Sequence, residues 1–214
     1  TKAFVVDLTD TALVQSTLTA RALGGLYVTE LNGNMYLEGA SSVTGTVSLK
    51  ATTGSIFDGL VSDTAKIFGN RIELTALAGN ALETDLAPSG SLMATAVGSI
   101  FISETLGDLN IDVIKSTTGD VTLSAKGSIL NAAQDGMGNN LALRTNIIAR
   151  SVTLTAENGS IGRSGSDIQI DSRFSGTGGM FTSASMQDTF VVEVLGNLLV
   201  NQIGTGVNAV GGTT

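Results

Sequence analysis

Short stretches of alternating apolar and polar residues recur along the chain, and most end in an alanine that a glycine soon follows. In one of the clearest, Val152, Leu154 and Ala156 alternate with two threonines. A period of two places the apolar residues on the buried face of a strand and the threonines on its exposed face. The terminal alanine predicts a tight interior corner, and the glycine of Gly159-Ser-Ile161 predicts a turn into the next strand.

Seven copies of this phrase, of uneven quality, run through the chain. Their strand-ending alanines are Ala20, Ala51, Ala76, Ala96, Ala125, Ala156 and Ala184. A second line of short strands follows many copies and begins at Leu109, Leu141, Ile168 and Leu198. Both lines repeat at about 27 residues, a spacing typical of solenoids. We therefore predict an all-β fold: a parallel β-solenoid with about three short strands in each coil of roughly 27 residues, about 40 Å long.

A longer period overlies the coils. Glu30, Glu104 and Glu193 each open a phrase that continues with a glycine and an Asn or Asp, and they lie 74 and 89 residues apart. This spacing predicts three-coil super-repeats that start near residues 16, 90 and 179, within one continuous segment spanning residues 1–214. Internal duplication of this kind also predicts that the chain is an excerpt of a longer protein.

Several of these phrases resemble the repeat region of giant bacterial exported β-helix proteins, the filamentous-haemagglutinin-like adhesins. The resemblance rests on segments such as Gly119-Asp-Val-Thr-Leu-Ser-Ala125 and Ser164-Gly-Ser-Asp-Ile-Gln-Ile-Asp171, and it covers nearly the whole chain. It implies a right-handed β-helix that acts as an extracellular shaft, a handedness that also agrees with the general preference of parallel crossovers. It carries over no catalytic residues.

Composition narrows the chemistry further. The 214 residues include no histidine and no cysteine, and the formal net charge is −8. The absence of histidine and cysteine excludes Ser–His and Cys–His catalytic pairs, disulfides and the commonest zinc ligand. The acidic balance argues against nucleic acid as a partner, and no apolar run approaches the ~18 residues of a membrane span. We predict that the chain is not an enzyme, has no catalytic or cofactor-binding residues and does not insert into a membrane.

Two groups of charged residues still allow a site. Asp112 and Asp171 are expected at the ends of second-line strands, with Arg144 on the coil between them. Such a column is more typical of a solvated ion pair, worth at most ~1 kcal/mol, than of a catalytic site.

The three matched glutamates form the second group, and we expect each to cap the backbone of its own turn. Alternatively Glu30, Glu104 and Glu193, with Asp108, supply oxygen ligands to calcium, the one cofactor that the sequence leaves open.

Carbohydrate chemistry is a separate hypothesis. A polysaccharide-processing β-helix enzyme would gather carboxylates in a groove formed by long loops, at Phe57–Gly69 or Asn131–Asn140. The charges of this chain are too dispersed to favour it. Tyr27, Phe101 and Phe190 would form either an outward aromatic column or, as we expect, staggered core filling.

The sequence thus favours a structural repeat segment of a large secreted or cell-surface adhesin or fibre, acting as an extended shaft. Its partners would be neighbouring coils, with any ligand on the host cell or surface bound elsewhere in the parent protein. The alternative is a self-assembling subunit that stacks end to end with identical copies into an extracellular filament or sheath, because open edge strands can template another chain.

Overall fold

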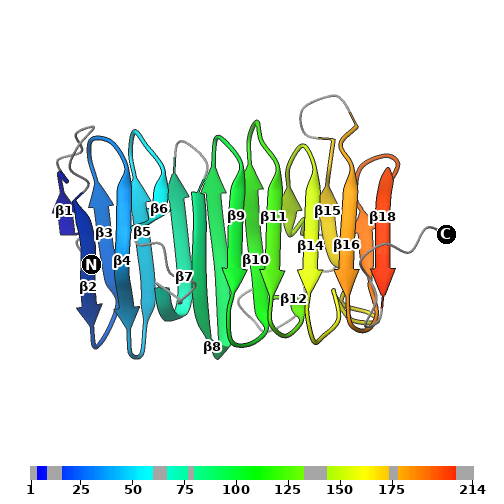
Figure 1. Cartoon of the computed structure of the whole chain (residues 1–214), viewed down its shortest axis with the longest axis horizontal. Coiled ribbons are helices and arrows are strands. Elements are labelled where there is room, and N and C mark those ends of the chain that lie inside the picture. Colours follow the sequence, from blue (N-terminus) through cyan, green and yellow to red (C-terminus); the bar gives the residue numbers. More distant parts are fainter. Residues whose placement is uncertain are drawn as a thin grey trace.

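The computed structural model describes residues 4–8, 16–59, 67–76, 80–132, 144–173 and 178–205, with the backbone alone described for 80–89. These residues form a parallel β-solenoid of about eight turns and contain no helix. Figure 1 shows the strands side by side across the long axis, with the first strands at one end of the body and the last at the other. The predicted all-β solenoid is therefore confirmed.

The described residues contain eighteen strands, all in one sheet. They are β1 (Phe4–Val6), β2 (Thr17–Ala22), β3 (Leu26–Glu30), β4 (Met35–Ser42), β5 (Thr46–Ala51), β6 (Ile56–Asp58), β7 (Ile67–Ala76), β8 (Asn80–Ala96), β9 (Ile100–Glu104), β10 (Leu109–Ser116), β11 (Val121–Ala125), β12 (Ile129–Asn131), β13 (Ile147–Ile148), β14 (Val152–Ala156), β15 (Ile168–Asp171), β16 (Phe181–Ser185), β17 (Val191–Glu193) and β18 (Val200–Thr205).

Each coil has three sides, which we call A, B and C. Side A contains β1, β3, β5, the later parts of β7, β8 and β10, and then β13, β15 and β17. Side B contains the starts of β2, β4 and β8, together with β6, β9, β11, β14, β16 and β18. Side C connects B to A and includes the start of β10 and β12. The predicted three strands per coil correspond to these sides, although the longer strands cover two of them and β8 covers all three.

The typical coil is shorter than the predicted 27 residues. Val28 is aligned with Leu49, 21 residues later, and Phe101 with Thr122, also 21 residues later. About 21 residues per turn is therefore the basic length. Longer coils carry additional residues in their connections, as between the aligned pair Thr122 and Thr153, 31 residues apart.

The error arose because copies of the same phrase lie on different sides of the coil. Ala96, on side A, is aligned not with Ala125 but with Ser116. Ala125 lies on side B, where it is aligned with Glu104 and Ala156. A spacing counted from Ala96 to Ala125 therefore measures one coil plus one further side.

The seven alanines consequently form more than one column. Ala51, Ala76 and Ala96 end strands of side A, whereas Ala125 and Ala156 end strands of side B. The two weaker copies do not follow the predicted pattern. Ala20 is aligned with Ala40 and only half-buried, and Ala184 faces outward because Ser185 is aligned with Ala156.

The three-coil super-repeat is also wrong in its register. Glu30 lies on side A, Glu104 on side B, and Glu193 again on side A, but in the column of Ile170. Successive matched glutamates are separated by three coils plus part of a turn, so they do not stack above one another.

Aliphatic side chains fill the interior. On β11, Val121, Leu123 and Ala125 are buried, while the two residues between them are half-exposed, as the period of two predicts. Leu123 is aligned with Leu154, and both are fully buried in one cluster that runs through the described coils. The burial of apolar surface that drives folding is therefore shared among the coils.

Glycines at two corners of the coil, Gly119 before one phrase and Gly159 after another, are needed for close approach between coils. A Cβ on Gly119 would lie 2.5 Å from the backbone nitrogen of Ser99 on the preceding coil, and one on Gly159 would lie 2.7 Å from that of Ser128. Neither glycine is among the four described residues with positive φ. Spacing between corners, rather than the predicted freedom of the turn, therefore requires glycine there.

A serine hydroxyl locks some of these corners to the coil before. Ser116 Oγ donates to the carbonyl of Gly98 on the preceding coil at 2.8 Å and accepts from the backbone N–H of Gly119 at 2.8 Å. Ser42 makes the equivalent pair of hydrogen bonds at 2.5 and 2.9 Å. Both serines belong to a Ser-x-Thr-Gly sequence, so this short motif marks a stacked corner.

We predict that the inward and outward positions of one strand differ sharply in their effect on stability. Leu154→Ala should lower the free energy of unfolding by about 2–5 kcal/mol, because it opens a cavity at a fully buried site. Thr153→Ala, the neighbouring outward position, should change it by less than about 1 kcal/mol. Urea unfolding followed by circular dichroism measures both. Equal effects would contradict the assigned orientation of β14.

Candidate functional site

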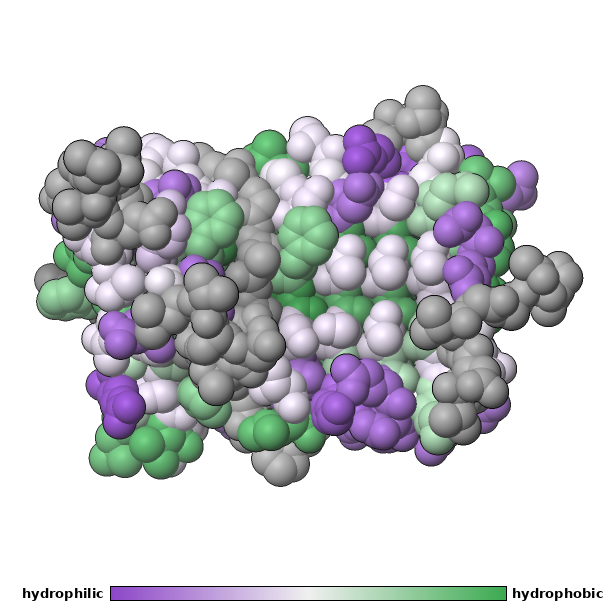
Figure 2. Space-filling model, viewed as in Figure 1, coloured by the Kyte–Doolittle hydropathy of each residue, from purple (hydrophilic) through white to green (hydrophobic). Residues whose placement is uncertain are grey.

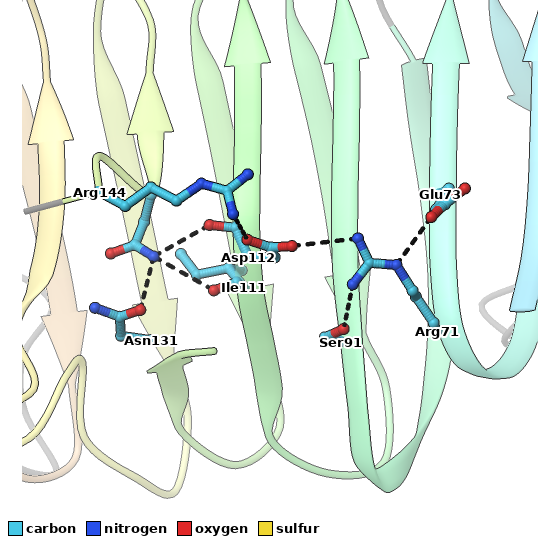
Figure 3. Close-up of polar contacts among 8 residues, drawn as sticks. Arg71, Glu73, Ser91, Ile111, Asp112, Asn131 and Arg144 are labelled. Atoms are coloured by element: carbon cyan, nitrogen blue, oxygen red, sulfur yellow. Dashed lines mark hydrogen bonds and ion pairs between the residues drawn. The ribbon is translucent and has the colours of Figure 1, made fainter. Parts of the chain in front are cut away.

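The densest group of charges lies where β10 passes from side C to side A. The register between β10 and β8 shifts between Ile111 and Val113, which leaves Asp112 as the extra residue of a β-bulge. The bulge turns Asp112 toward its neighbours, and the residue is 7% exposed. Figure 3 shows the side chains that converge on it from coils on both sides.

Asp112 lies between two arginines. Arg71 Nη2, from β7, is 3.2 Å from Asp112 Oδ2, and Arg144 Nη1 is 3.2 Å from Oδ1. The Arg144 contact is an ion pair without hydrogen-bond geometry. Arg71 also donates to Glu73 Oε1 at 2.9 Å and to Ser91 Oγ at 3.3 Å. The hydrogen bond to Glu73, followed by that to Asp112, raises the pKa of Arg71 against the opposing effect of burial.

The structure confirms only part of the predicted Asp–Arg–Asp column. Asp112 and Arg144 pair, but Asp171 is aligned with Ile148 on side A and accepts a hydrogen bond from the backbone of Arg173. The bulge has a signature in the sequence. Inward positions step by two up to Ile111 and then by three to Ile114.

A buried asparagine completes the cluster. Asn146 Nδ2 donates to Asn131 Oδ1 at 2.9 Å and to the carbonyl of Asp112 at 3.2 Å. Its Oδ1 accepts from the backbone N–H of Gln169 at 3.0 Å, so one side chain ties three successive coils. Since the amide is fully buried, these bonds offset the cost of removing it from water.

This cluster is suited to holding coils together rather than to chemistry. Both oxygens of Asp112 face guanidinium groups, and its side chain is only 10% exposed. An exposed ion pair provides a comparison: Arg150 forms two hydrogen bonds to Asp120, at 2.9 and 2.7 Å, and these lower the pKa of Asp120.

We predict that Asp112→Asn lowers the free energy of unfolding by about 1–3 kcal/mol. It leaves two guanidinium groups without their shared, nearly buried carboxylate, and their partial exposure reduces the cost below that of a fully buried pair. The matched control, Asp120→Asn, should cost less than about 1 kcal/mol because its ion pair is exposed. Chemical denaturation of both variants provides the comparison, and an effect of Asp112→Asn no larger than that of the control would contradict a structural role.

Two of the matched glutamates cap turns, as predicted. Glu30 is fully buried; its Oε1 accepts from the N–H of Asn32 at 3.0 Å and its Oε2 from that of Leu8 at 2.9 Å. Glu104 Oε1 accepts from the N–H of Leu106 at 3.2 Å. In the contacts with Asn32 and Leu106 the acceptor lies two residues before the donor, in the turn that the glutamate begins, whereas Leu8 belongs to an earlier part of the chain.

Glu193 and Asp108 hold other parts of the structure. Glu193 accepts from both the N–H and the hydroxyl of Ser172, on the preceding coil, with the hydroxyl at 2.6 Å. Asp108 Oδ1 accepts from the N–H of Ser128, on the following coil, at 2.7 Å. Within the described part of the chain, no three acidic residues gather in a way that could hold a metal ion.

We predict that calcium does not stabilise the fold. The midpoint of thermal unfolding should agree within about 1 °C in calcium and in a chelator, because Glu30 and Glu104 direct carboxylate oxygens at backbone N–H groups. Glu30→Gln should lower stability by about 1–3 kcal/mol in both conditions, since it places an amide N–H against a backbone donor. A calcium-dependent rise that Glu30→Gln abolishes would instead restore the calcium hypothesis.

The expected core filling by Tyr27, Phe101 and Phe190 is wrong, since Phe101 is 47% exposed and the other two are half-buried, and the three do not form a column either. Tyr27 is aligned with Ser48 on side A, Phe101 is on side B, and Phe190 follows the side C residue Thr189. Register instead places Tyr36 beside Phe57 on side B, with ring centroids 5.5 Å apart and planes 28° from parallel.

The same outward column of side B continues to the other end of the solenoid. Phe57 is aligned with Ala81, Ala81 with Phe101, and Phe101 with Thr122. Thr122 is followed by Thr153 and then Thr182. The sequence did not reveal this column because its members are separated by unequal coil lengths.

Comparisons with known proteins identify no relative. No protein-family model, curated protein or solved structure matches the chain. The described residues include no helix able to cross a membrane. Of the two loops considered for an enzyme groove, residues 60–66 and 133–140 lie outside the described parts of the chain.

Proposed function

We propose that this chain is a non-catalytic structural segment of a large secreted or cell-surface adhesin or fibre, in which it serves as an extended shaft. The observation that carries the proposal is the use made of its buried acidic groups. Glu30, Glu104 and Asp112 are directed at turns and neighbouring coils, rather than at an open cleft.

The dimensions support the same role. About eight turns at ~4.8 Å each give a body about 40 Å long, in which every described coil hydrogen-bonds to its neighbours in parallel. A solenoid gains length in proportion to its number of coils, because each coil needs only its neighbours for burial. The resemblance of its phrases to the repeats of filamentous-haemagglutinin-like adhesins agrees with an extracellular location.

A self-assembling filament subunit is a second candidate, favoured by the ends of the described structure. Phe4 and Val5 of β1 are 68% and 55% exposed. At the other end Val200 is 46% exposed, and Ile203, aligned with the buried Ser183, is 43% exposed. Side A ends in β1 and β17 and side B in β2 and β18, so a second copy could continue both sides in parallel, in an open head-to-tail array.

We predict that the isolated segment behaves as a monomeric rod. Small-angle scattering and sedimentation over a hundredfold range of protein concentration should give one elongated particle, about 40 Å long, at every concentration. A concentration-dependent filament, seen by electron microscopy, would favour the subunit. In that case Ile203→Lys should abolish the filament, whereas Leu106→Lys, at an exposed turn in the middle of the body, should not. A compact globular particle would contradict both candidates.

A further inference from the structure

Four neighbouring strands of side B present an outer face without any charged side chain. These strands are β9, β11, β14 and β16. Two outward columns cross them in register: Phe101, Thr122, Thr153 and Thr182 form the first, and Ser103, Ser124, Thr155 and Ala184 form the second. Positions repeat at ~4.8 Å from coil to coil and at ~7 Å along each strand.

Figure 2 shows this face as pale rows that follow the long axis over β11, β14 and β16. Strongly hydrophilic residues gather below them, at the turns that follow β11 and β14. There Lys126 and Glu157 pair at 2.6 Å, so these charges are set at the margin of the face. The face itself combines hydroxyl groups with the methyl groups of threonine.

The hydroxyls in the middle of the face are available to a ligand. Thr122, Thr153 and Thr155 hydrogen-bond to no other described residue through their side chains, and each is half-buried. Other hydroxyls of the face already have partners: Ser124 donates to Ser103 at 2.9 Å, and Thr182 accepts from Asn201 at 3.2 Å. A hydroxyl both donates and accepts, so three of them at fixed spacing form an array that can match another hydroxylated surface.

Aromatic rings extend the first column toward the N-terminal end. Phe101 is 47% exposed, and the stacked pair Tyr36 and Phe57 lies further along the same column. Phe57 and Phe101 are two coils apart, or ~10 Å. A ligand lying along the axis would therefore meet apolar ring surface at one end and hydroxyls at the other.

We infer that this face binds a neutral, flat polysaccharide such as a β-linked glucan, with the sugar chain lying along the solenoid axis. Sugar rings offer both apolar faces and hydroxyl groups, which the aromatic and threonine parts of the column complement. Arginine and lysine are absent from the two columns, and the net charge of −8 would repel an acidic polysaccharide. Each further coil repeats the same contacts with a repeating polymer, so individually weak contacts add.

A protein partner fits this face less well. Protein interfaces are usually centred on Trp, Tyr or Arg side chains that fill pockets. The part of the face that spans β11, β14 and β16 carries only serine, threonine and alanine at its outward positions. The inference goes beyond the proposed shaft and does not rest on it.

The test is co-sedimentation of the 214-residue chain with insoluble β-glucan, compared with starch granules and with an immobilised acidic polysaccharide. We expect binding to the β-glucan and at least tenfold weaker binding to the acidic polymer. The triple variant Thr122→Val, Thr153→Val and Thr155→Val removes three hydroxyls but keeps side-chain shape and strand preference. It should weaken binding to β-glucan about tenfold or more.

The matched control is Thr75→Val with Thr95→Val, which alters two aligned outward threonines of side A. This control should bind like the unaltered chain. Phe101→Ser should bind more weakly than both the unaltered chain and the control. Circular dichroism confirms that every variant remains folded. Absence of binding to the β-glucan, equal binding by the triple variant, or preference for the acidic polymer would each overturn the inference, whatever the shape measurements show about the shaft.

Discussion

Parallel hydrogen bonding between successive coils is the constraint on which the rest of this structure depends. The N–H of Val121 donates to the backbone carbonyl of Ser151 on the next coil at 2.9 Å. The N–H of Lys126 donates to the backbone carbonyl of Glu104 on the previous coil, also at 2.9 Å. Because the register is kept, an inward position on one coil remains inward on its neighbours. The aliphatic columns, the close glycine corners and the outward threonine rows all follow from this single alignment.

The same alignment explains where polar groups can be buried. Several polar side chains enter the interior where the coil is irregular or changes direction, whereas Ser183 is buried in the middle of the regular strand β16. Asp112 does so at a bulge, and Asn146 at the start of a strand that follows a long connection. Glu30 and Glu104 do so where strands end and the N–H groups of turns need acceptors. Asp112, Asn146, Glu30 and Glu104 thus mark irregularities or ends of strands in the coil.

The sequence predicted the class of fold well because alternation within a strand is a local property. It predicted the coil length badly because β11 on side B and β8 on side A end in the same alanine phrase. Nothing in a single strand says which side of the coil it will occupy. The residue aligned with Ala96 on the next coil is Ser116. Because it is a serine rather than an alanine, the alanine pattern did not identify it, although it occupies the same corner.

Prediction of the individual sites was limited for a related reason. The capping by Glu30 and Glu104 was predictable, since donor and acceptor are two residues apart. The contact between Arg71 and Asp112 spans 41 residues, crosses two coils and depends on a bulge. The outward column of side B likewise appears only when the register of each coil is known. Predicting long-range contacts of this kind requires the length of every connection between the two residues.

The direction of the hydrogen bonds between coils has a mechanical consequence. They run along the long axis, so tension applied along that axis loads each interface between coils in series, and the weakest one opens first. Each coil that detaches releases about 21 residues, which extend to roughly 70 Å in place of the ~4.8 Å that the coil occupied. Under load the solenoid would lengthen step by step as coils detach. Each step would dissipate work while the remaining coils stay folded.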